Sequence, residues 1–347
     1  MNTPFYPKVS IIIPHYNGID ILDDCLTSLQ QSTYANIEII VIDNASKDGS
    51  PEIIHQHFPD IILLKNKTNE GFAGGCNRGA SQAKGKYLLF LNNDTTQEPD
   101  WIEPLVNCLE KEEVIGAVQP KILNYFEKNL FDYAGGSGGH MDILCFPFAR
   151  GRIFTEQEID TGQYNASEKV FWASGTAIMV RKDLFIKAEE FDNTFFAHME
   201  EIDLCWRLNM LGYEIWAEPR SVIYHKNATT LPMYSLKKYY LNHRNSMYMM
   251  CSNYSILLTI YLFPLRIALE ISAIFYALVK LDWKHVVAII MSVFWVLFHP
   301  HLIIKKRRKN RTIKTIRDRM IMKNMFRGSI VWDFYFRRKK YFSELVK

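Results

Sequence analysis

Residues 9–50 read VSIIIPHYNGIDILDDCLTSLQQSTYANIEIIVIDNASKDGS, and this stretch decides the fold class. The β-branched run over residues 9–13 predicts a buried strand. Apolar residues at helical spacing predict a helix over residues 19–31, and residues 37–42 predict a second strand. The following residues 43–50 are rich in turn formers. A strand, a helix and a second strand at this spacing are typical of a parallel α/β sheet.

The alternation continues beyond residue 50. A helix over 51–58, a strand over 61–64, a helix over 69–83 and a strand over 87–91 extend the pattern. We therefore expect a Rossmann-like, mostly parallel sheet flanked by helices. In such sheets ligands bind at the carboxyl ends of the strands. The residues predicted at those ends are Pro14, His15, Tyr16, Asn17, Asp43, Asn92, Asn93 and Asp94.

The pattern is less regular from about residue 116 to residue 235. The glycine-rich run over residues 135–139 indicates a flexible loop, residues 173–181 a strand and residues 199–211 a helix. We expect one catalytic domain over residues 1–235. Its first half, residues 1–115, would bind a nucleotide, and its second half, residues 116–235, would supply the acceptor side of the cleft.

The composition describes a folded protein, with 48% hydrophobic and 22% charged residues among 347. The six cysteines show no metal-ligand spacing and indicate buried, reduced thiols. Residues 1–4 lead into a strand without a signal-like region, so we expect the catalytic part on the cytoplasmic side.

The character of the sequence changes after residue 235. Residues 256–281 and 285–304 are apolar over about the length of a membrane span, with basic residues on both outer sides. The positive-inside rule predicts a hairpin over residues 236–304 with both ends in the cytoplasm. Helices lying in the membrane interface, or a soluble helical extension, are the alternatives. Residues 305–347 form a basic tail, for which a membrane surface is favoured over nucleic acid because of the apolar stretch before it.

Two polar clusters in the first half suggest nucleotide chemistry. Asp43 closes a strand and can accept the imide N–H of uracil or thymine, or it can merely cap a turn. Residues 69–79, NEGFAGGCNRG, form a glycine-rich loop that feeds a helix whose N-terminus favours anions. Alone, such a loop is a weak signal, and its spacing differs from the dinucleotide fingerprint.

Two further clusters suggest metal binding and acid–base chemistry. Asp94 follows an apolar strand and can hold a hard divalent cation, or it can be a turn residue. His225 is either a buried core histidine or a metal ligand. Glu200, Glu201 and Asp203 lie within one helical turn, and like charges this close raise at least one pKa. A solvated acidic helix face is the alternative, which the interleaved apolar residues disfavour.

The order of these clusters resembles bacterial inverting glycosyltransferases of family 2, and among them the rhamnosyltransferase-like members of envelope polysaccharide assembly. The resemblance covers roughly residues 7–250. It rests on the motifs PHYN (14–17), DNxSxD (43–48), NxGFAGG (69–75), LNND (91–94), SGTA (174–177), EExDLCWR (200–207) and YH (224–225).

The resemblance implies a GT-A fold and a role for each matching position. Asp43 would recognise the nucleobase, Asp94 and His225 would hold Mg²⁺ or Mn²⁺, and Glu201 would be the catalytic base. Glu200 and Asp203 would orient the acceptor or the base. The residues expected to bind the nucleotide sugar are Pro14, Tyr16, Asn17, Asp43, Asn69, Gly71, Gly74, Asn77, Asn93 and Arg244. For Arg244 a role as a membrane-facing cation is equally open.

The sequence departs from the family pattern at two positions. Asn92 stands where the family's DxD motif has its first acid, so protein ligation of the metal would rest on Asp94 and His225. Glu201 stands where many members have Asp, which leaves the choice between Glu200 and Glu201 as the base open.

We therefore expect a metal-dependent hexosyltransferase at the cytoplasmic face of the cell membrane. It would move a sugar from a dTDP-rhamnose-like or UDP-sugar donor to a glycan or polyprenyl-linked acceptor. A nucleotidyltransferase and a membrane-associated nucleotide-sugar-binding protein without turnover are the alternatives. The sugar, the base, the linkage and the oligomeric state are not determined by the sequence.

Overall fold

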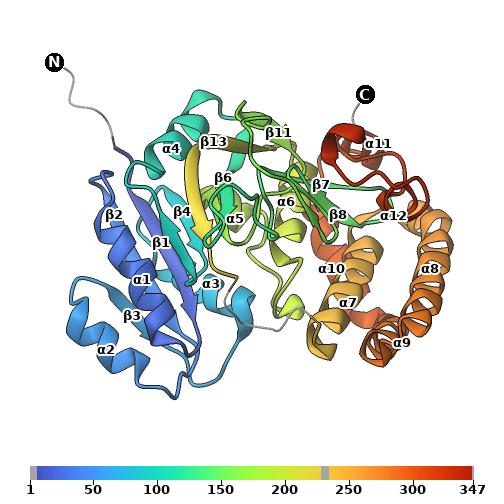
Figure 1. The fold of residues 1–347 in the computed structure, drawn as a ribbon, viewed down its shortest axis with the longest axis horizontal. Helices are drawn as coiled ribbons and strands as arrows, with labels where there is room; N and C mark the ends of the chain where they lie inside the picture. Colours follow the sequence, from blue (N-terminus) through green and yellow to red (C-terminus); the bar gives the residue numbers. More distant parts are fainter. Residues whose placement is uncertain (1–5, 228–233, 346–347) are drawn as a thin grey trace.

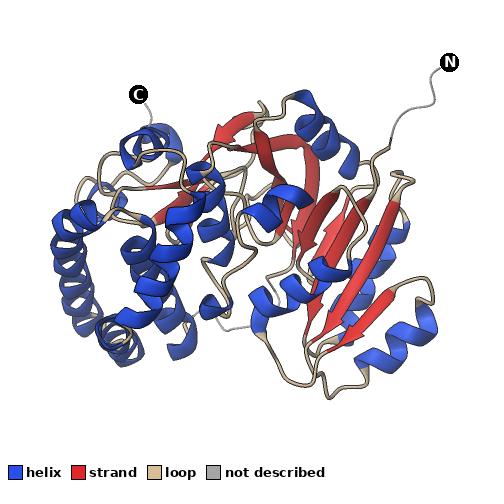
Figure 2. Ribbon diagram, turned by 180° about the vertical axis from the view of Figure 1, so that it is seen from behind, coloured by secondary structure: helices blue, strands red, loops and turns tan. Residues whose placement is uncertain are grey.

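The protein is described by a computed structural model over residues 6–227 and 234–345 (Figure 1). Residues 1–4, which carried the expectation about the N-terminus, lie outside this part. A twisted sheet with helices on its faces forms one side of the molecule, and the helices of the C-terminal third form a layer on the other side (Figures 1 and 2).

The first half has the predicted alternation of strands and helices. Its elements are β1 (Val9–His15), α1 (Ile19–Gln30), β2 (Ile37–Asp43), α2 (Ser50–His57), β3 (Ile62–Lys65), α3 (Gly71–Gln82) and β4 (Tyr87–Leu91). Strand β1 lies between β2 and β4 and is parallel to both. Its register with β2 pairs His15 with Asp43, so the polar residues after both strands meet at one edge of the sheet.

The second half extends the sheet with strands of both directions. Its elements are β5 (Thr95–Gln97), α4 (Ile102–Lys111), β6 (Ile115–Asn124), β11 (Glu168–Val170), β12 (Ala177–Arg181), α5 (Lys182–Lys187), a 3₁₀ turn (Asn193–Phe195), α6 (Glu200–Met210) and β13 (Glu214–His225). The strand order is β11-β13-β6-β12-β4-β1-β2-β3, with β5 paired to β13. Strand β12 is antiparallel to β4 and β6, so the sheet is mixed. Strands β6 and β13 are parallel to each other, as are β1 to β4, so the sheet is mostly parallel, as expected.

A second, four-stranded sheet lies beside the large one. It consists of β7 (Gly139–Met141), β8 (Pro147–Ala149), β9 (Arg152–Ile153) and β10 (Glu156–Gln157). The glycine-rich run before β7, which predicts a flexible loop, is instead buried in the structure. The Ser137 N–H donates to the Arg150 carbonyl at 2.9 Å, and a Cβ on Gly139 would overlap the Trp172 ring. Glycine serves here for close packing.

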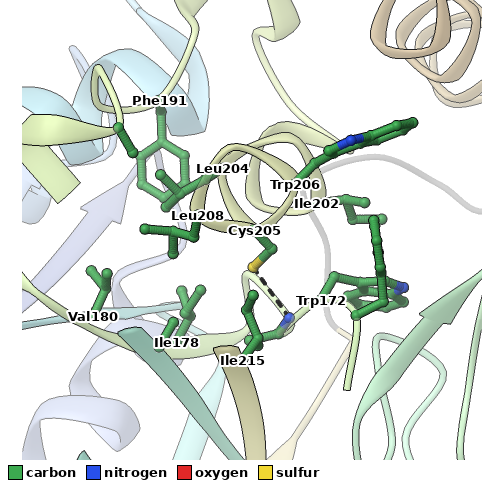
Figure 3. Packing of buried hydrophobic residues seen from close by; sticks show 14 of the residues in the cluster. Trp172, Ile178, Val180, Phe191, Ile202, Leu204, Cys205, Trp206, Leu208 and Ile215 are labelled. Carbon is green, nitrogen blue, oxygen red and sulfur yellow. Dashed lines mark hydrogen bonds between the residues drawn. The ribbon is translucent and has the colours of Figure 1, made fainter. Parts of the chain in front are cut away.

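Helix α6 is held firmly by the core (Figure 3). Leu204, Cys205, Trp206 and Leu208 are all fully buried against strand residues such as Ile178. The Cys205 thiol also accepts a hydrogen bond from the Ala173 N–H at 3.4 Å. All six cysteines are buried and free of disulfides, as predicted. The rigid body of α6 therefore fixes the direction of the acidic residues in its first turn.

The C-terminal third consists of helices that pack against the catalytic half. They are α7 (Leu236–Asn253), α8 (Ile256–Val279), α9 (Trp283–Phe298), α10 (Pro300–Ile313), α11 (Asp318–Ile321) and α12 (Ile330–Tyr335), with 3₁₀ turns over Met322–Asn324 and Phe342–Glu344. The basic region after residue 304 folds back onto the molecule. Lys306 Nζ lies 2.7 Å from Asp203, and the Phe342 N–H donates to Glu158 at 3.0 Å.

One helix of the described residues, α8, is long and apolar enough to cross a membrane. The second predicted span, residues 285–304, is not one straight helix. It is divided between α9 and α10, which meet at an angle of 67°. Pro300 begins α10, where its missing N–H is tolerated, and it cannot continue α9 without losing a helix hydrogen bond. By length and composition alone this bent pair and α8 are weak evidence for spanning.

Candidate active site

A cavity of about 1360 Å³ opens at the carboxyl edge of the parallel strands. Its walls come from the ends of β1, β4 and β13, from the loop before α3, and from the loop that leads into α6. It continues between α7, α8 and α12. Of the predicted residues, those that line it are Pro14, Tyr16, Asn17, Asn69, Gly71, Asn93, Asp94, Glu200, Glu201 and His225. The structure thus brings residues that are distant in the sequence to one site.

The loops after β1 and β2 are tied to each other at the entrance of this cavity. The Asn17 N–H donates to Ser46 Oγ at 2.9 Å, and the Lys47 N–H donates to Asn17 Oδ1 at 2.9 Å. The Gly18 N–H donates to an Asp48 carboxylate oxygen at 2.6 Å. The role of Asn17 in the structure is therefore to join two loops, and its neighbour Tyr16 is exposed toward the cavity.

Asp43 is buried and does not line the cavity. Its carboxylate accepts from the Ser46 N–H at 3.2 Å and 3.3 Å, which is the capping of a turn. The adjacent Asn44 does line the cavity, and its side chain donates to the Gly71 carbonyl at 3.2 Å. Recognition of a base by Asp43 stays a prediction.

The glycine-rich loop approaches the loop before α6 closely. Gly71 has φ +73°, and a Cβ there would lie 2.3 Å from the Phe196 carbonyl oxygen. That same oxygen accepts from the Phe72 N–H at 2.9 Å. The first turn of α3 and the loop carrying the acid pair are thereby joined, so the two walls of the cavity are positioned together.

Asp94 and His225 face each other across the cavity wall. His225 Nε2 lies 3.1 Å from Asp94 Oδ1, and His225 Nδ1 lies 2.9 Å from Asp132 Oδ1. All three side chains are nearly inaccessible to solvent. Burial lowers the pKa of His225, but the charges of Asp94 and Asp132 outweigh it and raise this pKa to about 10.

These residues fit a divalent cation. Asp94 Oδ1 and His225 Nε2 lie 3.1 Å apart, and a cation that displaces the proton between them would bind both atoms, while Asp132 holds the ring of His225 through Nδ1, as second carboxylates do in metal sites. No group of three or more His, Cys, Asp or Glu side chains with metal-ligand geometry occurs in the described part of the chain. The protein would therefore offer two ligands and leave positions for oxygens of a bound substrate.

Glu200 and Glu201 are the acidic pair of the cavity. Burial and the charge of Glu201 hold the pKa of Glu200 well above its ordinary value. Burial also raises the pKa of Glu201, although backbone N–H groups including that of Gly175 oppose this. One carboxylate oxygen of each residue has no hydrogen-bond partner within the described structure. Such a pair can hold one proton and accept another.

The backbone before this pair is strained. His198 and Met199 have φ values of +67° and +74°, a region that residues with a Cβ rarely adopt. The Asn245 side chain holds this backbone by donating to the carbonyls of Phe195, Ala197 and His198 at 3.2, 2.9 and 2.7 Å. The strained loop is therefore fixed from α7.

Besides Asp43, four predicted site residues lie away from the cavity. Arg244 does not line the cavity: its guanidinium donates to the carbonyls of Thr194 and Phe195 at 2.8 and 2.9 Å, so it supports the same loop rather than a diphosphate. It does not face a membrane either, because it is buried. The other residues away from the cavity are Gly74, whose Cβ would meet Glu70, and Asn77, which is bonded to Phe191.

Asp203 is the fourth residue away from the cavity. Its carboxylate is fully buried and accepts from Arg207 at 2.9 Å, Lys306 at 2.7 Å and Asn253 at 2.9 Å. It therefore links α6, α7 and α10, and this placement does not support a role in orienting the acceptor or the base.

Three residues at or next to the cavity carry no motif in the sequence. Asp132 follows an aromatic residue in an irregular region, and only its contact with His225 reveals it. Arg152 and Lys238 line the continuation of the cavity on the acceptor side. The nearby pair of basic residues at 237–238 was visible in the sequence, but nothing there placed it next to residue 152.

A mostly parallel first half, a carboxylate–histidine pair at the ends of strands and an acid pair on a facing helix are the features of a glycosyltransferase of the GT-A type. The chain belongs to glycosyl transferase family 2, whose sequence profile matches residues 10–187. The resemblance seen in the sequence is thereby confirmed.

Known proteins support this assignment. The O-antigen biosynthesis protein RfbC of Myxococcus xanthus is 30% identical over 230 residues, which are 64% of this chain and 18% of that protein. The N-acetylglucosaminyl-diphospho-decaprenol L-rhamnosyltransferase of Mycobacterium tuberculosis is 25% identical over 225 residues, 60% of this chain and 73% of that protein. The chain spans between 16% and 33% of the length of several other curated relatives.

The fold is also that of a solved glycosyltransferase structure. The crystal structure of GalNAc-T7 with UDP, GalNAc and Mn²⁺ superposes with a TM-score of 0.60 at 17% identity, covering 75% of this chain and 50% of that one. The expected GT-A architecture is confirmed.

Proposed function

We propose that this protein is an inverting glycosyltransferase that moves a sugar from a nucleoside-diphosphate sugar to a hydroxyl of a glycan or lipid-linked acceptor. The observation that carries the proposal is the shared cavity, in which the Glu200–Glu201 pair and the Asp94–His225 pair both present side chains. One pair suits removal of a proton from an acceptor hydroxyl, and the other suits a diphosphate leaving group.

Glu201 is the better candidate for the base. More backbone N–H groups stabilise its anion than that of Glu200, so Glu201 loses its proton more readily. Glu201 would take the proton of the acceptor hydroxyl, whose oxygen bonds to the anomeric carbon while the bond to the diphosphate breaks. A single displacement of this kind inverts the anomeric configuration.

Asp94 and His225 would hold Mg²⁺ or Mn²⁺, with Asp132 keeping the ring of His225 in place. When bound, the metal would neutralise charge on the departing diphosphate. Tyr16, Asn69 and Asn93 line the same part of the cavity and are the side chains we assign to the donor.

The relatives suggest the biological setting. One is named for O-antigen biosynthesis and another for rhamnosyl transfer to a diphospho-decaprenol acceptor. We propose accordingly a hexosyltransferase of cell-surface polysaccharide synthesis, with a dTDP-rhamnose-like or UDP-sugar donor. It would work at the cytoplasmic face of the cell membrane.

The direct test is a donor screen with the purified full-length protein. dTDP-rhamnose and a set of UDP-sugars are incubated with Mn²⁺ or with EDTA and a synthetic polyprenyl-diphosphate N-acetylhexosamine. We expect transfer from one donor, dependent on the metal, and an inverted anomeric centre by NMR. Donor binding without transfer would support a nucleotide-sugar-binding protein, and nucleotide transfer to a sugar phosphate would support a nucleotidyltransferase; either result would overturn the proposal.

A further inference from the structure

Beyond the acid pair the cavity continues between α7, α8 and α12, and we call this part the arm. Two cationic side chains, Arg152 and Lys238, line the beginning of the arm. Arg152 of β9 and Lys238 of α7 both contact the ring of Tyr133, with their charged groups 4.5 Å and 5.7 Å from its centre. All three residues line the cavity. The tyrosine face accommodates the cations but does not neutralise them.

The charge of Asp132 acts on Lys238, but within residues 6–227 and 234–345 no carboxylate lies within ion-pair distance of either cation. Neither residue takes part in an ion pair there, and the Nε of Arg152 is buried without a hydrogen-bond partner. Burial and the charge of Arg152 lower the pKa of Lys238, and the charge of Asp132 opposes this only in part. By contrast Lys340, which also lines the cavity, is paired with Glu156 at 2.8 Å. Two unneutralised cations side by side in a cavity attract an anion with more than one charge.

The walls of the arm beyond the two cations are largely apolar, although the Arg266–Glu270 ion pair and Lys280 of α8 also line the cavity. Leu269, Ala273 and Tyr276 line it from α8 at spacings of four and three residues, so they share one helix face. Phe334 and Tyr335 of α12 line the opposite side. The rings of Tyr276 and Tyr335 lie 5.4 Å apart, which shows that α8 and α12 approach each other along the arm.

The outer side of α8 is apolar as well. Leu257, Tyr261 and Val279 are 82%, 72% and 81% exposed, and they follow one another along the side of the helix away from Ala277, which is buried. A chain leaving the arm past α8 therefore meets a further apolar surface. Together, a charged start, an apolar passage and an apolar exit match a molecule with an acidic head on a long hydrocarbon chain.

We propose that this arm binds the acceptor through its lipid carrier, with a phosphate or diphosphate group held by Arg152 and Lys238 and the hydrocarbon chain lying between α8 and α12. This inference rests on the proposed function, because it takes the occupant to be the acceptor of the sugar. The sugar to be extended would then point from the two cations toward Glu201, which lines the same cavity.

The test measures binding of farnesyl diphosphate to the full-length protein in EDTA, where the metal-assisted donor site is weakened. The double variant Arg152→Gln/Lys238→Gln should bind at least about tenfold more weakly than the wild type. Lys187→Gln, an exposed residue of α5 outside the cavity, and Asp94→Asn should each bind within about twofold of the wild type. Circular dichroism checks the fold of each variant.

Several outcomes would overturn the inference. Wild-type affinity in the double variant would show that the cations do not hold the anion, and equal binding of farnesol would show that no anion is needed. If inorganic pyrophosphate bound as tightly as farnesyl diphosphate, the hydrocarbon chain would contribute nothing to binding. If UDP displaced farnesyl diphosphate, or if Asp94→Asn no longer bound farnesyl diphosphate, Arg152 and Lys238 would belong to the donor site. Absence of sugar transfer would weaken the proposed function but would leave this binding result unchanged.

Discussion

Gly71 shows how a single residue sets the width of the site. Its positive φ and its close approach to the Phe196 carbonyl allow the start of α3 to touch the loop that carries the acid pair. A side chain at this position must push the two loops apart. The distance between the nucleotide side and the acceptor side of the cavity therefore depends on the absence of one Cβ.

Gly71→Ala should lower the free energy of unfolding by about 2 to 4 kcal/mol, since it combines a left-handed backbone with a collision against backbone atoms. Gly49→Ala is the matched control: Gly49 has φ +81°, but a Cβ there would meet nothing within 4 Å. The control should lose only about 1 to 2 kcal/mol. Denaturant unfolding of both variants measures the difference, and equal losses would contradict the close approach.

Glu201 gives a prediction about pH. Its pKa is raised by burial, so a larger fraction is protonated at low pH than for an ordinary glutamate. A base must be deprotonated to act, and kcat/KM should therefore rise with pH through a midpoint above 4.5, the ordinary value for glutamate. A pH–rate profile measures this midpoint. An acid limb at or below 4.5 would show that another group controls the activity.

For single residues, the sequence predicted those cavity-lining residues that belong to motifs. It did not predict residues whose place depends on a contact with a distant part of the chain. Asp94 and His225, which both line the cavity, could be proposed from the sequence because Asp94 closely follows β4 and His225 ends β13. Asp132 was missed because only the fold brings it to His225. Arg244 was assigned to the donor because charge shows in a sequence, whereas its burial against the 194–195 carbonyls does not.

Helix α6 is the element on which the acid pair depends. Its apolar residues pack into the core (Figure 3). Asp203 joins its first turn to α7 and α10 through Asn253 and Lys306. The Arg207 side chain neutralises the same carboxylate from within the helix. The element is thus positioned from three sides before any substrate is bound.

Asp203→Asn should therefore act on stability rather than on chemistry. It leaves Lys306 and Arg207 with less negative charge in a buried place, and we expect a loss of roughly 3 kcal/mol in unfolding free energy. At a temperature where the variant is folded, kcat should stay within a few-fold of the wild type. Calorimetry and transfer kinetics test this together. A hundredfold loss of kcat at unchanged stability would restore a role at the reaction centre.

The elements of the first half were predictable because each carries its own hydrophobic period. Strands β1, β2 and β4 and the body of α6 agree with the sequence to within about two residues at most ends. The strand predicted over 173–181 begins only at Ala177, since residues 174–176 turn to line the cavity. The break between α9 and α10 was not predicted, because hydropathy does not report a change in the direction of a helix. Pro300, the first residue of α10, lies at this break.

At the scale of the whole molecule, α8 and α9 present an apolar outer surface that a membrane could cover. α8 is also tied to the catalytic half by Arg266, which donates to the Leu144 carbonyl at 2.7 Å and to Glu270 at 2.8 Å. A helix in this position can lie in the membrane interface while its buried ion pair stays in the protein. Crossing the bilayer would bring the pair into hydrocarbon, which is costly.

We therefore expect the protein to bind vesicles of anionic lipid and to be released from membranes by alkaline carbonate. The triple variant Leu257→Gln/Tyr261→Gln/Val279→Gln should bind vesicles at least about tenfold more weakly, because it removes apolar area from the outer surface of α8. A control variant, Phe126→Gln/Ile159→Gln/Ile186→Gln, alters apolar residues of the catalytic half that are 75%, 57% and 55% exposed.

Flotation of vesicles measures both variants. Equal loss in the control would show that binding is not specific to α8. Retention of the wild type in the membrane after carbonate treatment would show instead that the C-terminal helices span the bilayer.

Single-turnover sugar transfer by Glu201→Gln tests the central claim most directly. The assay uses the donor from which the wild type transfers sugar. Removal of a general base should lower the rate constant by about 10² to 10⁴ while donor affinity and the melting temperature stay close to those of the wild type. The isosteric change keeps the packing of α6 and removes only the proton acceptor. Near-normal transfer by the folded variant would contradict the assignment of this cavity as the place where the sugar is moved.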